Sequence, residues 1–118
     1  MLGNNLPKSV LAKGRLKSGE MNKLEKAYHD HLSKRMYSGD IAWFKFECMK
    51  FKLADGCYYT PDFMVMGNDG ELQIHECKGS KHMFTDDAKV KVKVVRDTFP
   101  MRVFIIYKNT QGFDIEEY

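Results

Sequence analysis

The sequence has no long apolar run and few cysteines, and both absences limit what the chain does. None of its hydrophobic stretches approaches the roughly 18 residues of a membrane-spanning helix, and its first residues lack the apolar core of a signal peptide. The three cysteines, Cys48, Cys57 and Cys77, form no CxxC pair, and an odd number argues against a disulfide scaffold. We therefore expect a cytoplasmic protein with no membrane partner.

Acidic residues are missing from the start of the chain, where Lys8, Lys13, Arg15 and Lys17 occur. Residues 1–52 contain eleven Lys/Arg and five Asp/Glu, whereas residues 53–118 contain eight and eleven. This asymmetry favours a flexible basic arm over residues 1–17 that contacts a polyanion such as nucleic acid. The alternative is a frayed terminus without a partner. The rest, residues 18–118, has the length of one domain.

Hydrophobic periodicity predicts one helix followed by three strands. Residues 19–37 carry apolar side chains at three- or four-residue spacing, and Ser18 is the expected N-cap. Residues 41–53, 57–66 and 71–78 are rich in aromatic and β-branched residues, and the turn sequences "ADG" and "GNDG" separate them. Such short connections predict an antiparallel meander.

Residues 85–100 fit a strand by alternation and a helix by the spacing of Ala88, Val92, Val95 and Phe99. We expect a helix, because Thr85 or Asp86 suits its N-cap and early acids suit its dipole. The apolar run "MRVFIIYK" then predicts a strand buried on both faces. The expected order is α-β-β-β-α-β, an α/β fold with a mixed sheet flanked by helices.

Two carboxylates occupy positions on the expected strands where burial makes a charge costly. Alternate residues of a strand share a face, so Glu76 and Lys78 continue an apolar row, while Gln73, His75 and Cys77 point the other way. Pairing around "GNDG" brings Asp62 near Glu76, and a proline before Asp62 suits an interruption of the ladder. Two close carboxylates repel unless a divalent cation holds them, and oxygen ligands suit Mg²⁺ or Mn²⁺.

One acid of the first predicted helix joins this pattern. At 100° per residue, Glu25 lies within the apolar stripe, whereas Glu20 lies well off it. We therefore expect Glu25 to face the two strand carboxylates, directly or through a water. The alternative is that Lys78 simply forms an ion pair with Asp62 or Glu76, without chemistry.

The motifs Pro61-Asp62 and Glu76-Cys77-Lys78 resemble the signature of the PD-(D/E)xK nuclease superfamily, whose restriction-endonuclease-like core has the order αβββαβ. The segments "LEKAYHDHL", "YTPDFMV", "ECKG" and "DDAK" are similar to phage Holliday-junction resolvases of the endonuclease I type. The resemblance spans residues 18–107 and extends to small uncharacterised phage nucleases.

The resemblance implies a DNA endonuclease that uses Mg²⁺ or Mn²⁺, cuts branched DNA such as a Holliday junction and leaves 5′ phosphates. Asp62, Glu76 and the backbone carbonyl of Cys77 would bind the metal, and Glu25 would complete a site for a second ion. Lys78 would orient or help deprotonate the attacking water. A homodimer acting on two strands, in a bacterial cytoplasm if the gene is of phage origin, is the expected active form.

Basic residues outside these motifs are candidates for contacts with the DNA backbone. They are Lys13, Arg15 and Lys17 of the arm, and Lys81, Lys89, Lys93 and Arg96 at or on the second helix. Three other interpretations stay open: a catalytically inactive DNA-binding module, a nicking or restriction-type nuclease on linear duplex, and a zinc or nucleophilic site at His75 and Cys77.

Overall fold

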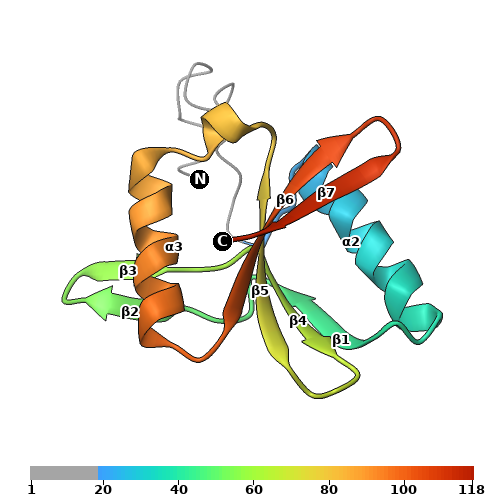
Figure 1. The fold of residues 1–118 in the computed structure, drawn as a ribbon, viewed down its shortest axis with the longest axis horizontal. Coiled ribbons are helices and arrows are strands. Elements are labelled where there is room, and N and C mark those ends of the chain that lie inside the picture. Colours follow the sequence, from blue (N-terminus) through green and yellow to red (C-terminus); the bar gives the residue numbers. More distant parts are fainter. Residues whose placement is uncertain (1–18) are drawn as a thin grey trace, which may run out of the picture.

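A mixed sheet lies between two helices in the computed structural model, which describes residues 19–118 (Figure 1). Its five strands follow the order β1-β4-β5-β6-β7, and only β5 and β6 run parallel. Their bounds are Ile41–Phe46, Phe63–Gly67, Leu72–Lys78, Arg102–Asn109 and Gly112–Glu117. The predicted basic arm and the predicted Ser18 cap lie outside the described residues.

Helix α2 spans Lys23–Tyr37 and so begins later than the predicted start at Gly19. The backbone explains the difference, because Gly19 has a φ of 87°, which a right-handed helix does not accommodate. Asn22 is the N-cap instead: its side chain accepts the Glu25 N–H at 2.8 Å, and Glu25 accepts the Asn22 N–H at 2.9 Å. This reciprocal capping box fixes the first turn.

The segment that fitted both strand and helix is helix α3, Asp86–Thr98, with the predicted Thr85 as N-cap. Burial follows the helical period, since Val92 and Val95 are buried while Val90 is 62% exposed. A helix is also what the topology requires, because the parallel strands β5 and β6 need a crossover connection. Short helix η2, Lys81–Met83, leads into it.

The first two predicted strands were wrong in one respect, because each is interrupted. Residues 41–53 break after Phe46, where Glu47 has a φ of 44° and donates its N–H to the Asp62 carbonyl at 2.9 Å. Residues 57–66 break at Pro61, which lacks an N–H for the ladder. The outer pieces, β2 (Phe51–Ala54) and β3 (Cys57–Tyr59), form a separate hairpin that packs against α3.

The last strand, β7, was not predicted. A polar turn after β6 returns the chain antiparallel to it, and Asn109 stabilises that turn by accepting the Gln111 N–H at 2.9 Å. The Asn109 amide also donates to Asp114 at 2.7 Å. Sequence reasoning missed β7 because its exposed, acidic side chains lack the apolar pattern by which strands are recognised.

Side chains of the central strands alternate between two cores, as the sequence predicted. Met64, Ile74 and Val103 pack with the α3 side chains, whereas Phe63, Cys77 and Ile106 pack with Tyr28 and Leu32 of α2. Strand β5 therefore presents Glu76 toward the α3 face and His75 toward the α2 face. None of the helices within residues 19–118 is long and apolar enough to cross a membrane.

Candidate active site

Three carboxylates and two lysines line a single cavity of about 410 Å³ at the end of β5. Asp62 directly precedes β4, Glu76 and Lys78 belong to β5, and Glu25 lies in the first turn of α2. The cavity is completed by the helix N-terminus and the segment after β5: Asn22, Lys23, Leu24, Cys77, Gly79 and Met83. The structure therefore brings together all four side chains that the sequence proposed for catalysis.

The hairpin register places Asp62 beside Glu76. Phe63 pairs with His75, so the next residues outward are the two acids. The Asp62 N–H donates to Glu76 Oε1 at 3.3 Å, and the Cys77 N–H donates to Asp62 Oδ2 at 2.8 Å. Each acid thus accepts a backbone amide from the other strand segment, which orients both carboxylates where Pro61 opens the ladder.

Glu76 is held by two further side chains. It is 7% exposed, and Tyr59 donates its hydroxyl to Glu76 Oε1 at 2.7 Å. Lys78 Nζ lies 3.3 Å from Glu76 Oε2. Burial and the adjacent Glu76 raise the pKa of Tyr59, so the hydroxyl keeps its proton and remains a donor. Lys78 forms the ion pair that the alternative interpretation required, but this pair lies inside the cavity and beside two further acids.

Sequence reasoning missed Tyr59. Tyr58 and Tyr59 are adjacent aromatic residues of β3, and only the packing of the β2–β3 hairpin against α3 buries Tyr59 while leaving Tyr58 42% exposed. Tyr59 is two residues from Pro61 in "YYTPD", on the strand that precedes the break. The break that splits the predicted strand is therefore also what lets Tyr59 reach Glu76.

Glu25 has two neighbours in the site. One of its oxygens accepts the Asn22 N–H in the capping box, and its charge is close enough to Asp62 to contribute to the raised pKa of that residue. The capping box fixes the direction of the Glu25 side chain. A residue that sequence reasoning placed on the inner face of α2 therefore does face the strand carboxylates.

Crowding of acids governs the electrostatics of the cavity. Burial, the Glu76 carboxylate and Glu25 together raise the pKa of Asp62 to about 9, although the hydrogen bond from Cys77 acts in the opposite direction. A carboxyl group in this position is costly to ionise without a nearby cation. The cavity contains two lysines, Lys23 and Lys78, against three acids.

The donor set suits a hard divalent cation. Asp62, Glu76 and Glu25 each use one oxygen to accept a backbone N–H. The second oxygen of Glu76 pairs with Lys78, and the second oxygens of Asp62 and Glu25 are left as cation ligands. Within residues 19–118, no three His, Cys, Asp or Glu side chains are already grouped in the geometry of a metal site. Mg²⁺ does not need such a group, because it retains several waters and takes one or two carboxylates plus phosphate oxygens.

His75 and Cys77 do not form the alternative zinc or nucleophilic site. His75 Nδ1 accepts from the Tyr28 hydroxyl at 2.6 Å, and Nε2 bonds to Gln73 Oε1 at 3.0 Å, so both ring nitrogens are engaged. Burial, followed by Asp62 and Glu76, raises the pKa of the Cys77 thiol. A protonated buried thiol is a poor nucleophile. The backbone carbonyl of Cys77 as a metal ligand stays a prediction.

The predicted DNA contacts on and near α3 lie on the surface beside β7. Lys81 Nζ is 3.6 Å from Glu116, Lys89 lies over the Phe84 ring, and Arg96 lies over the Tyr118 ring and bonds to Asp97. Lys93 is exposed. Their contact with DNA stays a prediction, and Lys13, Arg15 and Lys17 lie outside the described residues.

Comparison of the chain with models of known protein families, with curated proteins and with solved structures finds no match. The assignment of chemistry to this site therefore rests on the side chains that line it and on their geometry.

Proposed function

We propose that this protein is a Mg²⁺- or Mn²⁺-dependent DNA endonuclease of the PD-(D/E)xK type. The observation that carries the proposal is the convergence of Glu25, Asp62, Glu76 and Lys78 on one cavity, with Asp62 made costly to ionise by its acidic neighbours. Setting aside the β2–β3 hairpin and β7, the remaining elements follow the order αβββαβ that the resemblance implies.

Each group has a role in this proposal. Asp62, Glu76 and the Cys77 carbonyl hold the ion, which would supply positive charge to the phosphodiester transition state. Lys78 orients the attacking water, because its ammonium projects into the same cavity as the carboxylates. Glu25 binds a second ion or its water. The N-terminal turn of α2 faces the cavity with its partial positive charge, which favours an anionic substrate. Cleavage leaves a 3′ hydroxyl and a 5′ phosphate.

The direct test is cleavage of linear, nicked, forked and four-way DNA by the purified protein with Mg²⁺ or Mn²⁺. The double variant Asp62→Asn/Glu76→Gln should lose cleavage by more than about 100-fold, because both carboxylate ligands are gone. Asp55→Asn is the matched control, since that side chain is 99% exposed at the tip of the β2–β3 hairpin, where it pairs with Lys52. Equal cleavage by the double variant would overturn the proposal, and DNA binding without cleavage by the wild type would favour the inactive binding module.

The finer proposal is that two copies cut two strands of a branched junction. A domain of this size offers one metal site, and two-fold symmetry supplies the second. Wild-type protein mixed with Glu76→Gln subunits should then bind the junction and nick only one strand. A monomer on the DNA, as seen by sedimentation, together with equal rates on linear duplex and four-way DNA would contradict the dimer but not the nuclease assignment.

A further inference from the structure

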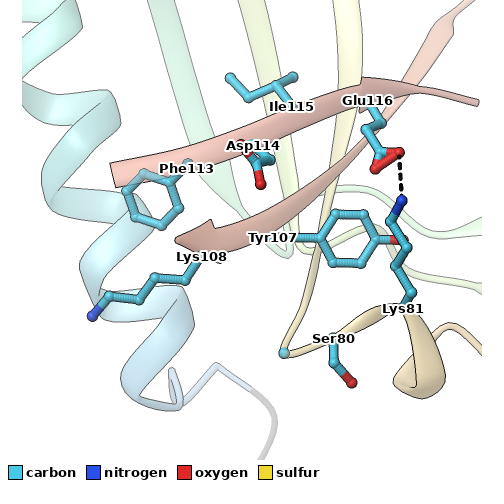
Figure 2. Close-up of a pocket in the computed structure, with 9 residues that line it drawn as sticks. Ser80, Lys81, Tyr107, Lys108, Phe113, Asp114, Ile115 and Glu116 are labelled. Carbon is cyan, nitrogen blue, oxygen red and sulfur yellow. Dashed lines mark ion pairs between the residues drawn. The ribbon is translucent and has the colours of Figure 1, made fainter. Parts of the chain in front are cut away.

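A second, larger cavity lies beside the candidate active site, between the β6–β7 hairpin and the segment that follows β5. We call it the hairpin pocket. Its volume is about 690 Å³, within the range of roughly 300–1,000 Å³ that is typical of ligand sites. Figure 2 shows its lining: Gly79, Ser80, Lys81, Tyr107, Lys108 and the β7 residues 113–116.

The hairpin pocket adjoins the active-site cavity. Gly79 lines both, and it directly follows Lys78. Tyr107 pairs with Lys78 across the parallel strands, so the two side chains start from neighbouring positions on the sheet. A Cβ at Gly79 would approach the Met83 sulfur to 3.0 Å, so glycine keeps the boundary between the two cavities uncrowded. A substrate bound at the carboxylates therefore has its adjoining part within reach of this pocket.

Two aromatic rings in the pocket are held by packing. Tyr107 is half-buried and packs against the α3-side core. Phe113 packs at 5.1 Å, between ring centroids, against both Tyr28 and His31 of α2. In the view of Figure 2 the Tyr107 ring lies between the Lys81–Glu116 ion pair at one end and Lys108 at the other. A fixed ring in an open pocket offers a flat surface on which another ring can stack.

Charge in the pocket is balanced rather than basic. Lys81 and Lys108 line it together with Asp114 and Glu116, and Lys81 already pairs with Glu116 at 3.6 Å. A chain of phosphates gains little from such a lining, because the pocket has as many acids as lysines and Lys81 is already paired. The edge of a nucleobase, which carries both donors and acceptors, finds matching groups in the carboxylates, the lysines and the Ser80 hydroxyl. The exposed Lys81–Glu116 pair is weak enough to rearrange around such a ligand.

We propose that the hairpin pocket binds an unpaired nucleotide of the DNA substrate, with its base stacked on Tyr107, next to the phosphate that is cut. The proposal rests on the nuclease function and assigns it a source of selectivity. A base inside a duplex must be unpaired and unstacked before it enters, whereas a fork or junction presents such a base at little cost. The pocket thus favours branched DNA over linear duplex without reading its sequence.

The first experiment measures binding in the presence of a chelator, with two DNA probes that carry 2-aminopurine. In a forked probe the 2-aminopurine is unpaired at the branch, and in a blunt duplex it is paired. Wild-type protein should bind the fork more tightly and quench its fluorescence by stacking. Tyr107→Leu should weaken fork binding by roughly 5- to 100-fold, as loss of a base–aromatic contact does, and leave duplex binding unchanged. Tyr107→Phe retains the ring and should bind the fork like wild type.

Tyr37→Leu is the matched control, because Tyr37 is 93% exposed at the far end of α2 and should not affect either probe. Equal loss of fork and duplex binding in Tyr107→Leu would overturn the proposal, and so would unchanged fork binding or the absence of any preference in the wild type. Circular dichroism establishes that the variants are folded.

A second experiment needs no variant. A forked probe with 5-iododeoxyuridine at the unpaired position is irradiated with the wild-type protein, and the crosslinked residue is identified by mass spectrometry. A crosslink at Tyr107 supports the proposal, and a crosslink only at residues outside the pocket overturns it. The two experiments distinguish this proposal from the nuclease function. If fork binding depends on Tyr107 but no metal-dependent cleavage occurs, the nucleotide site is supported and the nuclease function is wrong. If cleavage occurs but fork binding does not depend on Tyr107, the nuclease function is supported and the nucleotide site is wrong.

Discussion

His75 and Glu76 are neighbours on β5, yet their side chains face opposite sides of the sheet and very different surroundings. On the α2 side, Tyr28 donates to His75 Nδ1, and His75 bonds to Gln73, whose amide nitrogen donates to Glu71 at 2.8 Å. Because the Gln73 nitrogen is a donor here, its oxygen accepts, and His75 carries its proton on Nε2. In this series of hydrogen bonds, from Tyr28 through His75 to Gln73, the buried groups are neutral and each donor meets an acceptor.

On the α3 side and at the end of the strand, Glu76 belongs to a group whose charges do not balance. Asp62, Glu25 and Lys78 surround it, so acids outnumber bases in one cavity. The consequence appears in Asp62, whose pKa is raised to about 9 by burial and by these acids. His75 shows that this chain can bury a polar side chain with complete pairing. The unresolved repulsion around Glu76 is therefore a specific feature of the site, of the kind that binding of a cation relieves.

The largest expected effect concerns the pH dependence of stability on the Glu76 side. Folding raises the pKa of Asp62 from 3.8 to about 9, so its contribution to stability is complete below about pH 4 and is lost as the pH rises through 9. Without divalent metal, the free energy of unfolding should fall with rising pH in this window, by up to roughly 1.4 kcal/mol per pH unit. Urea unfolding in chelator measures it.

Two changes should flatten this pH dependence: saturating Mg²⁺, which competes with the proton, and Asp62→Asn, which removes the titrating group. Asp55→Asn, at an exposed position, should retain it. A pH dependence that is identical with and without Mg²⁺ would show that the cation does not bind at these carboxylates.

Truncation of Tyr28 tests the α2 side of the sheet, where the buried polar groups are fully paired. Its side chain is fully buried against Phe63 and Phe113 and bonds to His75, so Tyr28→Ala should lower the free energy of unfolding by about 3–5 kcal/mol. Tyr28→Phe should cost less, about 1–3 kcal/mol, because it leaves only the His75 nitrogen without its donor. Tyr37→Ala, on an exposed side chain of the same helix, should change stability by less than about 0.5 kcal/mol. A Tyr28→Phe variant as stable as wild type would show that the hydrogen bond contributes nothing.

Tyr59→Phe tests whether the hydroxyl serves the acidic side rather than the fold. Removing the donor at 2.7 Å leaves Glu76 with fewer partners to fix its direction, and we expect Mn²⁺ affinity to fall roughly 10- to 100-fold. Isothermal titration calorimetry measures the affinity. Tyr58→Phe, the adjacent and exposed tyrosine, is the control and should bind Mn²⁺ like wild type. Equal affinities for the two variants would remove Tyr59 from the site.

The smallest effect is the pH dependence on the His75 side, and its sign is opposite. Burial, then Arg35 and His31, lower the pKa of His75 to about 3. The unfolded chain therefore binds the proton first, and stability is lost as the pH falls below about 6.5 toward 3. At pH 5.5 the loss is about 1.3 kcal/mol, measured as the change in unfolding free energy from pH 7. His75→Gln should lack this component and the exposed His82→Gln should retain it; the same acid loss in both variants would contradict the assignment.

The sequence predicted the centre of the site better than its surroundings. Strand alternation and the "GNDG" turn are local rules, and they suffice to place Asp62 beside Glu76 and to send His75 to the other face. Helical periodicity likewise placed Glu25 on the inner side of α2. These predictions concern residues whose positions follow from one element or one hairpin.

The parts that sequence reasoning missed depend on contacts between distant segments. The break after Phe46 involves a hydrogen bond from Glu47 to Asp62, and the burial of Tyr59 requires α3 to cover the β2–β3 hairpin. The first residues of the predicted helix are not helical, because Gly19 has a positive φ and Asn22 caps the helix instead. Strand β7 pairs through its backbone with β6, which its polar sequence does not reveal.

Strand β7 also bears on how two copies can meet. Within residues 19–118, β7 is an outer strand whose free side presents unpaired backbone groups, the feature through which sheets of separate molecules join edge to edge and aggregate. Its outward residues include Asp114, Glu116 and Glu117, and pairing with a second β7 about Ile115 would set Asp114 directly opposite Glu116 of the other copy. Like charges facing each other across strands are unfavourable. The acidic edge therefore disfavours sheet extension through β7, and we expect the proposed junction-cutting dimer to assemble through a different surface.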